Sequence, residues 1–248
     1  SNISRFIPSM PNYIYAQTTD RIYINLFVPS KTTFETPKGT IELTQSSLMP
    51  WDGNITVKLQ PEKPVKSKLY IRIPGWASEN PVPGNLYSFI NTLDNRPVFK
   101  INDKEVTPTF ENGYAVLSKT WKTGDWVEIN FPFEIRKIRA SENIEDDRGK
   151  MALQLGPLVY CAEFADYENP DISNLVLPEN AVLSAEYEPG LLGGVNVISG
   201  DAKGIKVADN NSPVETWPRK FKAIPYYAWS HRGKGQMAVW IPTSRDSK

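Results

Sequence analysis

Cysteine and histidine are almost absent from this sequence of 248 residues, which contains only Cys161 and His231. A single cysteine excludes an internal disulfide. A structural zinc site takes about four cysteine or histidine ligands at close spacing, so this chain alone cannot build one from those residues. No Ser-His-Asp constellation can be assigned either, because the partners of His231 are undetermined.

Charge of one sign and long apolar runs are also lacking. The 28 Lys and Arg residues balance the 28 Asp and Glu residues without a basic block or stripe, which disfavours nucleic acid as a partner. No stretch approaches the roughly 20 apolar residues that span a membrane, and no signal peptide is visible. We therefore expect neither a nucleic-acid partner nor a membrane partner.

What the sequence does contain is a series of short runs with alternating apolar residues, separated by 21 prolines and 15 glycines. Alternation places one face of a strand in a core and the other in water. The runs are RIYINLFVPS (21–30), TIELTQ (40–45), NITVKLQ (54–60), KLYIRIPGW (68–76) and WVEINFPFEI (126–135). Without helical spans between them, they predict an all-β fold of two consecutive antiparallel β-sandwich, jelly-roll-like domains.

The domain boundaries follow from composition. We expect the first sandwich over 13–138 and the second over 139–248, with the seam in or near 136–150. The Pro- and Asn-rich residues 79–97 predict a loop. The run KMALQLGPLVYCAEF (150–164) is apolar on both faces, which predicts a central strand bent at Gly156-Pro157. Shorter strands are expected near 175–187 and 195–207.

The first residues differ from the rest. Ile3, Phe6, Ile7 and Met10 have the i, i+3, i+4, i+7 spacing of one apolar helix face. Pro8 and Pro11 would bend or end such a helix. We therefore expect a short amphipathic helix over 1–12.

Several residues have side chains that could act in catalysis or metal binding, and each could instead have a purely structural role. Cys161 lies in the apolar stretch GPLVYCAE and is expected to be a small buried hydrophobe rather than a nucleophile or metal ligand. His231, in AWSHRGKG, is interpreted as an exposed turn residue rather than a general base. Two carboxyl groups about 5–10 Å apart can hydrolyse a glycoside, and the loop ENIEDDRGK supplies acids: Glu142, Glu145, Asp146 and Asp147. We interpret them as solvated and assign no catalytic residue and no metal ligand.

Aromatic residues are plentiful, with seven Trp and eleven Tyr. Exposed aromatic rings stack on sugars, whereas buried ones fill sandwich cores. Trp76, Tyr226 and Trp229 are the candidates for a carbohydrate-binding surface, although burial is the commoner fate of such side chains.

Five segments in order resemble the C-terminal part of glycoside hydrolase family 127, which includes β-L-arabinofuranosidases. They are SNISRFIPSMPNYIYAQTTDRIYINLFVPS (1–30), LYIRIPGWA (69–77), NGYAVLSKTWKTGDWVEINFPFEIR (112–136), GKMALQLGPLVYCAE (149–163) and IPYYAWSHRGKGQMAVWIP (224–242). The likeness is weakest around 79–97 and 165–215.

The resemblance implies an N-terminal (α/α)6 barrel that holds a zinc-bound cysteine nucleophile and a glutamate acid/base. Those motifs have no counterpart here, and Cys161 matches a VYC strand of the family rather than its nucleophile. Residues 1–12 then look like the remnant of the last barrel helix, with Phe6, Ile7 and Met10 as the barrel interface. The alternative is that this helix merely caps a sandwich. No cofactor is expected in this segment, because the implied zinc belongs to the barrel.

The resulting hypothesis is a non-catalytic β region of a retaining glycoside hydrolase that docks on the barrel and is inactive alone. One alternative is a carbohydrate-binding module that uses exposed aromatics. A second is an enzyme complete in this chain, using the acids at 142–147 or His231, and a third is a purely structural spacer. Glycans and a homodimer remain open as partners. The bacterial periplasm and the cytoplasm both fit as locations.

Overall fold

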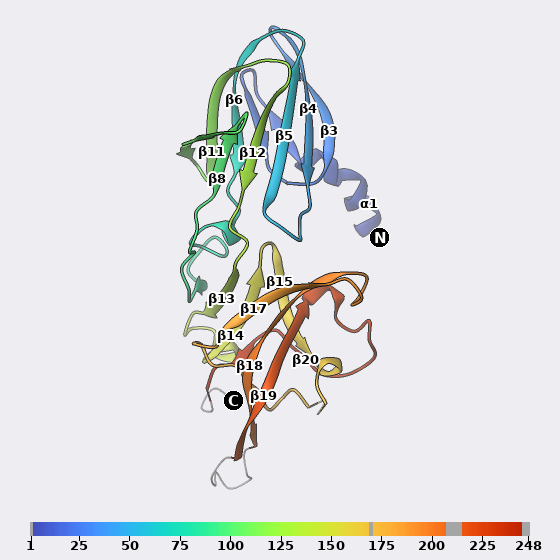
Figure 1. The fold of residues 1–248 in the computed structure, drawn as a ribbon, viewed down its shortest axis with the longest axis vertical. Helices are drawn as coiled ribbons and strands as arrows, with labels where there is room; N and C mark the ends of the chain where they lie inside the picture. Colours follow the sequence, from blue (N-terminus) through green and yellow to red (C-terminus); the bar gives the residue numbers. More distant parts are fainter. Residues whose placement is uncertain (1, 169–170, 207–214, 245–248) are drawn as a thin grey trace. The chain divides into compact units, whose positions relative to one another are not determined.

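A computed structural model of the chain describes residues 2–168, 171–206 and 215–244 (Figure 1). It divides into two compact units. Unit 1 comprises Ser1–Ala77 and Asp94–Pro132, and unit 2 comprises Ser78–Leu93 and Phe133–Lys248. Each unit is therefore built from two segments of the chain. Residues 78–93 of unit 2 lie in the sequence between the two segments of unit 1.

Unit 1 begins with a helix and is otherwise built from strands. The helical elements are α1 (Asn2–Ser9), η1 (Met10–Tyr13) and η2 (Gly75–Ala77). The strands are β1 (Tyr15–Gln17), β2 (Arg21–Ile24), β3 (Ser30–Thr36), β4 (Gly39–Ser47), β5 (Asn54–Pro61), β6 (Val65–Arg72), β8 (Val98–Ile101), β9 (Lys104–Val106), β10 (Thr109–Glu111), β11 (Tyr114–Trp121) and β12 (Asp125–Asn130).

Two sheets form unit 1, a five-stranded sheet in the order β1-β2-β6-β11-β10 and a six-stranded sheet in the order β3-β4-β5-β12-β8-β9. All pairs are antiparallel except β2 and β6, which run parallel. The alternating apolar side chains of both sheets are buried, as the sequence predicts. They include Ile24, Leu43, Val57, Leu69 and Val127, each 0% exposed. Burial of this apolar surface is the main driving force for folding of the unit.

Unit 2 has the strands β7 (Tyr87–Phe89), β13 (Ile135–Ala140), β14 (Lys150–Leu155), β15 (Leu158–Glu163), β16 (Leu175–Val176), β17 (Leu183–Glu188), β18 (Val195–Lys206), β19 (Glu215–Pro225), β20 (Met237–Ala238) and β21 (Ile241–Pro242). Its single turns of 3₁₀ helix are η3 (Glu145–Asp147), η4 (Phe164–Asp166) and η5 (Tyr226–Ala228). The strands join in one ten-stranded network whose main path is β16-β18-β19-β15-β14-β13-β7.

The core of unit 2 forms where this network surrounds a cluster of buried side chains. Leu153 and Leu155 from β14, Tyr160 from β15 and Phe221 from β19 belong to it. The all-β, sandwich-like fold expected from the sequence is thus confirmed, together with the short helix at the start of the described chain.

Three local expectations are corrected. The run 150–164 is not one bent central strand but the hairpin β14–β15, in which Leu155 pairs with Leu158. Its reversal uses Gly156, whose φ of +56° lies in the left-handed region that glycine occupies without a Cβ penalty. The predicted loop 79–97 contains strand β7. The run 126–135 belongs to two strands in different units, because β12 ends at Asn130 and β13 begins at Ile135.

The division between the units therefore lies at Pro132 and Phe133, whereas the sequence places the seam between 138 and 139. The reason is pairing: β13, which the sequence assigns to the first domain, bonds to β14 on one side and to β7 on the other. Among the described residues, no helix has the length and apolar character needed to cross a membrane.

Candidate functional site

Helix α1 presents an apolar face that is largely exposed to solvent. Ile3, Phe6 and Ile7 are 69%, 57% and 60% exposed, and Met10 in η1 is 37% exposed. No residue of α1 is buried. The Phe6 ring lies near the Tyr13 ring, and the two ring centroids are 6.4 Å apart. We call Ile3, Phe6, Ile7 and Met10 the α1 face, and it is the surface that the sequence assigns to a barrel interface.

A second exposed apolar surface lies where β19 ends in unit 2. Tyr226 and Tyr227 in η5 are 44% and 55% exposed, and Trp229 is 39% exposed. We call these three side chains the aromatic turn. The amide of Trp229 donates to the carbonyl oxygen of Tyr226 and so closes the turn. Three large, partly exposed rings thus lie within four consecutive residues, and exposed aromatic rings can stack on other planar or apolar groups.

An ion cluster holds the chain that follows the aromatic turn. The Arg232 guanidinium donates from Nε to Glu163 Oε2 at 2.9 Å and from Nη1 to Asp166 Oδ1 at 2.7 Å. The amide of Ser230 donates to Glu163 Oε1 at 2.7 Å. The Glu163 and Asp166 side chains are only 1% and 4% exposed, and that of Arg232 is 19% exposed. Both buried carboxylates are therefore paired, as buried charges must be.

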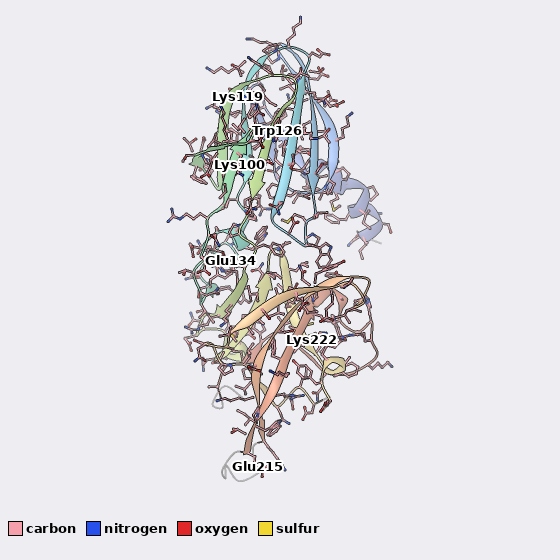
Figure 2. All side chains as sticks on the ribbon, viewed as in Figure 1. Lys100, Lys119, Trp126, Glu134, Glu215 and Lys222 are labelled. Atoms are coloured by element: carbon pink, nitrogen blue, oxygen red, sulfur yellow. The ribbon has the colours of Figure 1, made fainter. Side chains whose placement is uncertain are left out.

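Lys222, labelled in Figure 2, extends this cluster on β19. Its Nζ lies 3.9 Å from Asp166 Oδ1 and 2.8 Å from Glu188 Oε1. The hydrogen bond to Asp166, and after it the bond to Glu163, raises the pKa of Arg232 against the opposing effect of burial. The guanidinium therefore stays charged, and the aromatic turn is joined at its C-terminal side to β15 and η4.

The remaining sequence candidates lie apart from these surfaces. Trp76 is 7% exposed, and its ring packs edge-on against Phe131 at 5.5 Å, so its face is covered within unit 1. Cys161 is 0% exposed on β15, as the sequence predicts. Burial raises the pKa of this thiol to about 12, and the nearby carboxylates of Glu163 and Asp166 add to the shift. A thiol protonated at neutral pH is a poor nucleophile.

His231 is exposed in the turn after η5, as expected. The acidic residues of the 142–147 loop are mostly solvated, as the sequence interpretation expects. Glu142, Glu145 and Asp146 are exposed, and Glu142 forms an ion pair with Arg148 at 3.4 Å. Asp147 is half-buried, and burial raises the pKa of its carboxyl group. In the part of the chain that the structure describes, no three His, Cys, Asp or Glu side chains gather as a metal ion would require.

Sequence reasoning missed the ion cluster, and it counted Tyr227 among the aromatic residues at strand ends without choosing it as a binding candidate. Glu163 follows a run of apolar residues in the strand LVYCAE, and Arg232 lies almost seventy residues later, so neither spacing nor periodicity links them. The only available signal was a charged residue at the end of an otherwise apolar strand.

The fold and the two exposed surfaces define a class of protein: a tandem of β-sandwich-like domains that carries an apolar helix face on one unit and an aromatic turn on the other. Comparison with known proteins then identifies its family. The family model described as the β-L-arabinofuranosidase GH127 middle domain matches 21–133, and that of the glycoside hydrolase family 127 C-terminal domain matches 135–242. The chain belongs to glycoside hydrolase family 127 and fits its C-terminal region.

Relatives support the same placement. A non-reducing end β-L-arabinofuranosidase from Bifidobacterium longum is 28% identical over 259 aligned positions, which cover 97% of this chain and 36% of the relative. A solved GH127 β-arabinofuranosidase is 34% identical, with a TM-score of 0.90. The match covers 100% of this chain and 38% of the solved chain. A GH127 β-L-arabinofuranosidase from Geobacillus stearothermophilus T6 is 34% identical with a TM-score of 0.84, at coverages of 97% and 36%. The chain thus spans well under half the length of these relatives.

Proposed function

We propose that this chain is the non-catalytic β region of a β-L-arabinofuranosidase-like glycoside hydrolase and that it docks on a helical catalytic barrel through the α1 face. The observation that carries the proposal is the exposure of Ile3, Phe6 and Ile7 at 57–69% in a helix with no buried residue. The match to the middle and C-terminal domains of the family supports it.

The chemistry in this proposal lies outside the chain. The family resemblance implies a retaining mechanism in which a zinc-bound cysteine attacks the sugar and a glutamic acid protonates the leaving oxygen. The described residues offer no set of ligands for that metal, and the one thiol, Cys161, is buried and protonated. The role proposed for the two units is therefore to support the barrel.

Substitution on the α1 face tests the docking. Phe6→Asp in the whole enzyme places a charge in the proposed interface. We expect it to reduce the stability of the whole enzyme by roughly 2 kcal/mol, the value of burying such a side chain, and to reduce its hydrolysis of β-L-arabinofuranosides. The same substitution in this chain alone should leave its melting temperature unchanged, because Phe6 is already exposed there.

Arg5→Asp is the matched control, since Arg5 lies on the opposite side of the helix at 100° per residue from the centre of the α1 face. It introduces the same residue without touching the apolar face. Equal stability of the Phe6→Asp and Arg5→Asp enzymes would contradict docking through this face. Hydrolysis by this chain alone, clearly above the blank rate, would contradict the non-catalytic assignment.

A second candidate function is carbohydrate binding by the aromatic turn. The observation that favours it is the exposure of Tyr226, Tyr227 and Trp229 on one turn that the Arg232 ion cluster holds in place. Calorimetric titration of this chain with arabinan oligosaccharides tests it. Trp229→Ala should abolish the heat, whereas Tyr187→Ala, which removes a 50% exposed ring on β17, should not. An absence of heat at millimolar sugar would eliminate this candidate.

A further inference from the structure

The outer face of the five-stranded sheet in unit 1 gathers basic side chains that do not form a block in the sequence. Alternate residues of strand β6 are buried, namely Val65, Ser67, Leu69 and Ile71. The intervening residues lie on the other face of the strand, and they are Lys66, Lys68, Tyr70 and Arg72. Arg21 of β2 is the register partner of Lys68 in the parallel pair β2–β6. Four cations therefore share one face of two neighbouring strands.

Few acidic side chains balance these cations in the described part of the chain. Lys66, Lys68 and Arg72 form no ion pair and no side-chain hydrogen bond there. Arg21 lies 3.7 Å from Asp20, and the two side chains are 41% and 65% exposed. The face therefore carries a surplus of positive charge, although the whole chain has no net charge.

Three tyrosine rings lie among these cations. Tyr23 of β2 and Tyr70 of β6 are register partners, and their ring centroids are 4.6 Å apart. The ring of Tyr114 on β11 lies 5.5 Å from that of Tyr23 and 6.0 Å from that of Tyr70. The Arg21 guanidinium lies 5.6 Å from the centre of the Tyr70 ring. These neighbours cover Tyr70, which is only 3% exposed, whereas Tyr23 and Tyr114 stay half-buried and open to a partner.

Hydrogen bonds hold two of the rings in place. The Tyr70 hydroxyl donates to Oε2 of Glu111 at 3.1 Å, which occupies an acid on the same side of the sheet, and the Tyr114 hydroxyl donates to Oδ1 of Asn25 at 2.8 Å. Ordered side chains lose little conformational freedom on binding, and tyrosine and arginine are enriched where proteins bind partners. We call the accessible part of this surface the basic sheet face, made of Arg21, Tyr23, Lys66, Lys68, Arg72 and Tyr114.

We propose that the basic sheet face binds an acidic oligosaccharide, a chain of sugar rings that carry carboxylates. The C–H faces of the sugars stack on Tyr23 and Tyr114, and their carboxylates pair with the unpaired cations of β6. Lys68 and Arg72 lie about 13 Å apart along the strand, at about 3.3 Å per residue. One sugar ring does not span that distance, so the ligand is an oligomer.

Two observations favour a carbohydrate over other polyanions. The chain belongs to a glycoside hydrolase family, and a sugar ring uses the tyrosine rings as well as the cations. An acidic peptide segment without rings would use the cations alone. The basic sheet face includes neither the α1 face nor the aromatic turn, so its failure would leave both proposed functions standing.

Calorimetric titration of this chain with oligogalacturonate tests the proposal, and the same oligosaccharide with methyl-esterified carboxyl groups is the matched probe. We expect the acidic form to bind, and to bind more weakly as salt rises from about 50 mM to about 500 mM, because salt screens exposed charges. The ester should bind roughly tenfold more weakly, since it lacks several ion pairs of modest strength. Equal affinities for the two forms, or no heat from the acidic form at millimolar concentration, would overturn the proposal. Poly-L-glutamate of equal charge should bind more weakly than oligogalacturonate, and equal or tighter binding would make this a site for acidic protein segments instead.

Lys68→Gln and Arg72→Gln locate the binding on this face. Each should weaken oligogalacturonate binding roughly two- to fivefold, the range of an exposed ion pair, and leave the melting temperature of the free chain unchanged. Lys58→Gln is the matched control, because Lys58 is exposed on β5 of the six-stranded sheet and its loss removes the same charge from another surface of unit 1. It should leave the affinity unchanged. Equal losses in the three variants would mean that binding follows net charge alone, and a loss only in Trp229→Ala would move it to the aromatic turn; either result would overturn the proposal.

Discussion

At the scale of single residues, the ion cluster of unit 2 gives the largest expected effect. Arg232→Met removes the cation that pairs with Glu163 and Asp166, whose side chains are 1% and 4% exposed. Glu163 then remains buried without the Arg232 counter-ion, and Asp166 keeps only Lys222, whose Nζ lies 3.9 Å away. Breaking a buried pair in this way costs about 3–5 kcal/mol. We expect a loss of stability of that order, measured by urea unfolding of the chain.

Lys220→Met is the matched control for this prediction. It removes an ion pair in the same unit, between Lys220 on β19 and Asp201 on β18, whose side chains are 88% and 84% exposed. Exposed pairs are screened by water and contribute little, so the urea midpoint should barely move. Similar losses in the two variants would show that the buried carboxylates are not held by Arg232.

The buried thiol and phenols of unit 2 predict an alkaline limit to stability. Burial raises the pKa of Cys161 to about 12 and that of Tyr167 to about 12, and it also raises the pKa of Tyr160. The unfolded chain releases these protons at lower pH than the folded chain. Their contribution to stability is therefore complete below about pH 9 and is lost as the pH rises toward the folded pKa values.

Urea unfolding from about pH 8.5 to about pH 11 checks this expectation. The midpoint should fall with rising pH, and Cys161→Ala should make the fall less steep, because one of the titrating groups is gone. In the native protein at neutral pH, Cys161 should not react with a disulfide reagent, and it should react after unfolding. Rapid reaction of the native thiol would contradict its burial.

At the scale of elements, the sequence predicts strands with a regular apolar alternation and misses features that depend on how strands pair. The half-buried strands were readable because alternation reports burial on one face, as in Ile55, Val57 and Leu59 of β5, all at most 1% exposed. Alternation says nothing about where a strand that is buried on both faces reverses. The β14–β15 hairpin was therefore missed, although Gly156 and Pro157 mark its turn.

That turn yields a sharp prediction. A Cβ added to Gly156 would lie 2.2 Å from Cε2 of Phe133, and the φ of +56° is itself unfavourable for alanine. Gly156→Ala should therefore cost about 2–4 kcal/mol, from backbone strain and overpacking together. Gly193→Ala in the same unit is the control, because its φ is +82° but nothing lies within 4 Å of the added Cβ. It should cost only about 1 kcal/mol, so equal losses in urea unfolding would exclude the steric contribution.

The two exposed surfaces show the same limit of sequence reasoning. The α1 face was predicted from helical spacing, because a period of 3.6 places Ile3, Phe6 and Ile7 together whatever the helix contacts. The aromatic turn was predicted only in part, since ring counts do not separate Trp76, which is buried, from Tyr226 and Trp229, which are exposed.

At the scale of the whole molecule, unit 2 is discontinuous in sequence, and its segment 78–93 covers a buried charge. Arg136 is 1% exposed, and its guanidinium lies 3.6 Å from the centre of the Phe89 ring. The guanidinium donates to the carbonyl oxygens of Ser78 and Asn91, each at 3.1 Å. Strand β7 also pairs with β13 through Ile138 and Phe89. No local pattern in the Pro- and Asn-rich segment 79–97 could have indicated this pairing.

A chain of residues 133–248 alone should therefore be less stable than the whole of unit 2. Without 78–93, Arg136 loses both carbonyl acceptors and the Phe89 ring, and β13 becomes an open edge. Joining 78–93 to 133–248 through a short Gly/Ser linker in place of 94–132 restores these contacts. The connection is feasible because Asn91 bonds to Ile135 and Lys137. We expect the joined chain to unfold cooperatively at a higher temperature and the shorter one to bind an apolar dye and aggregate, because its edge and its buried cation are uncovered. Equal melting temperatures would mean that the domain begins at Phe133 and that 78–93 contributes nothing to its stability.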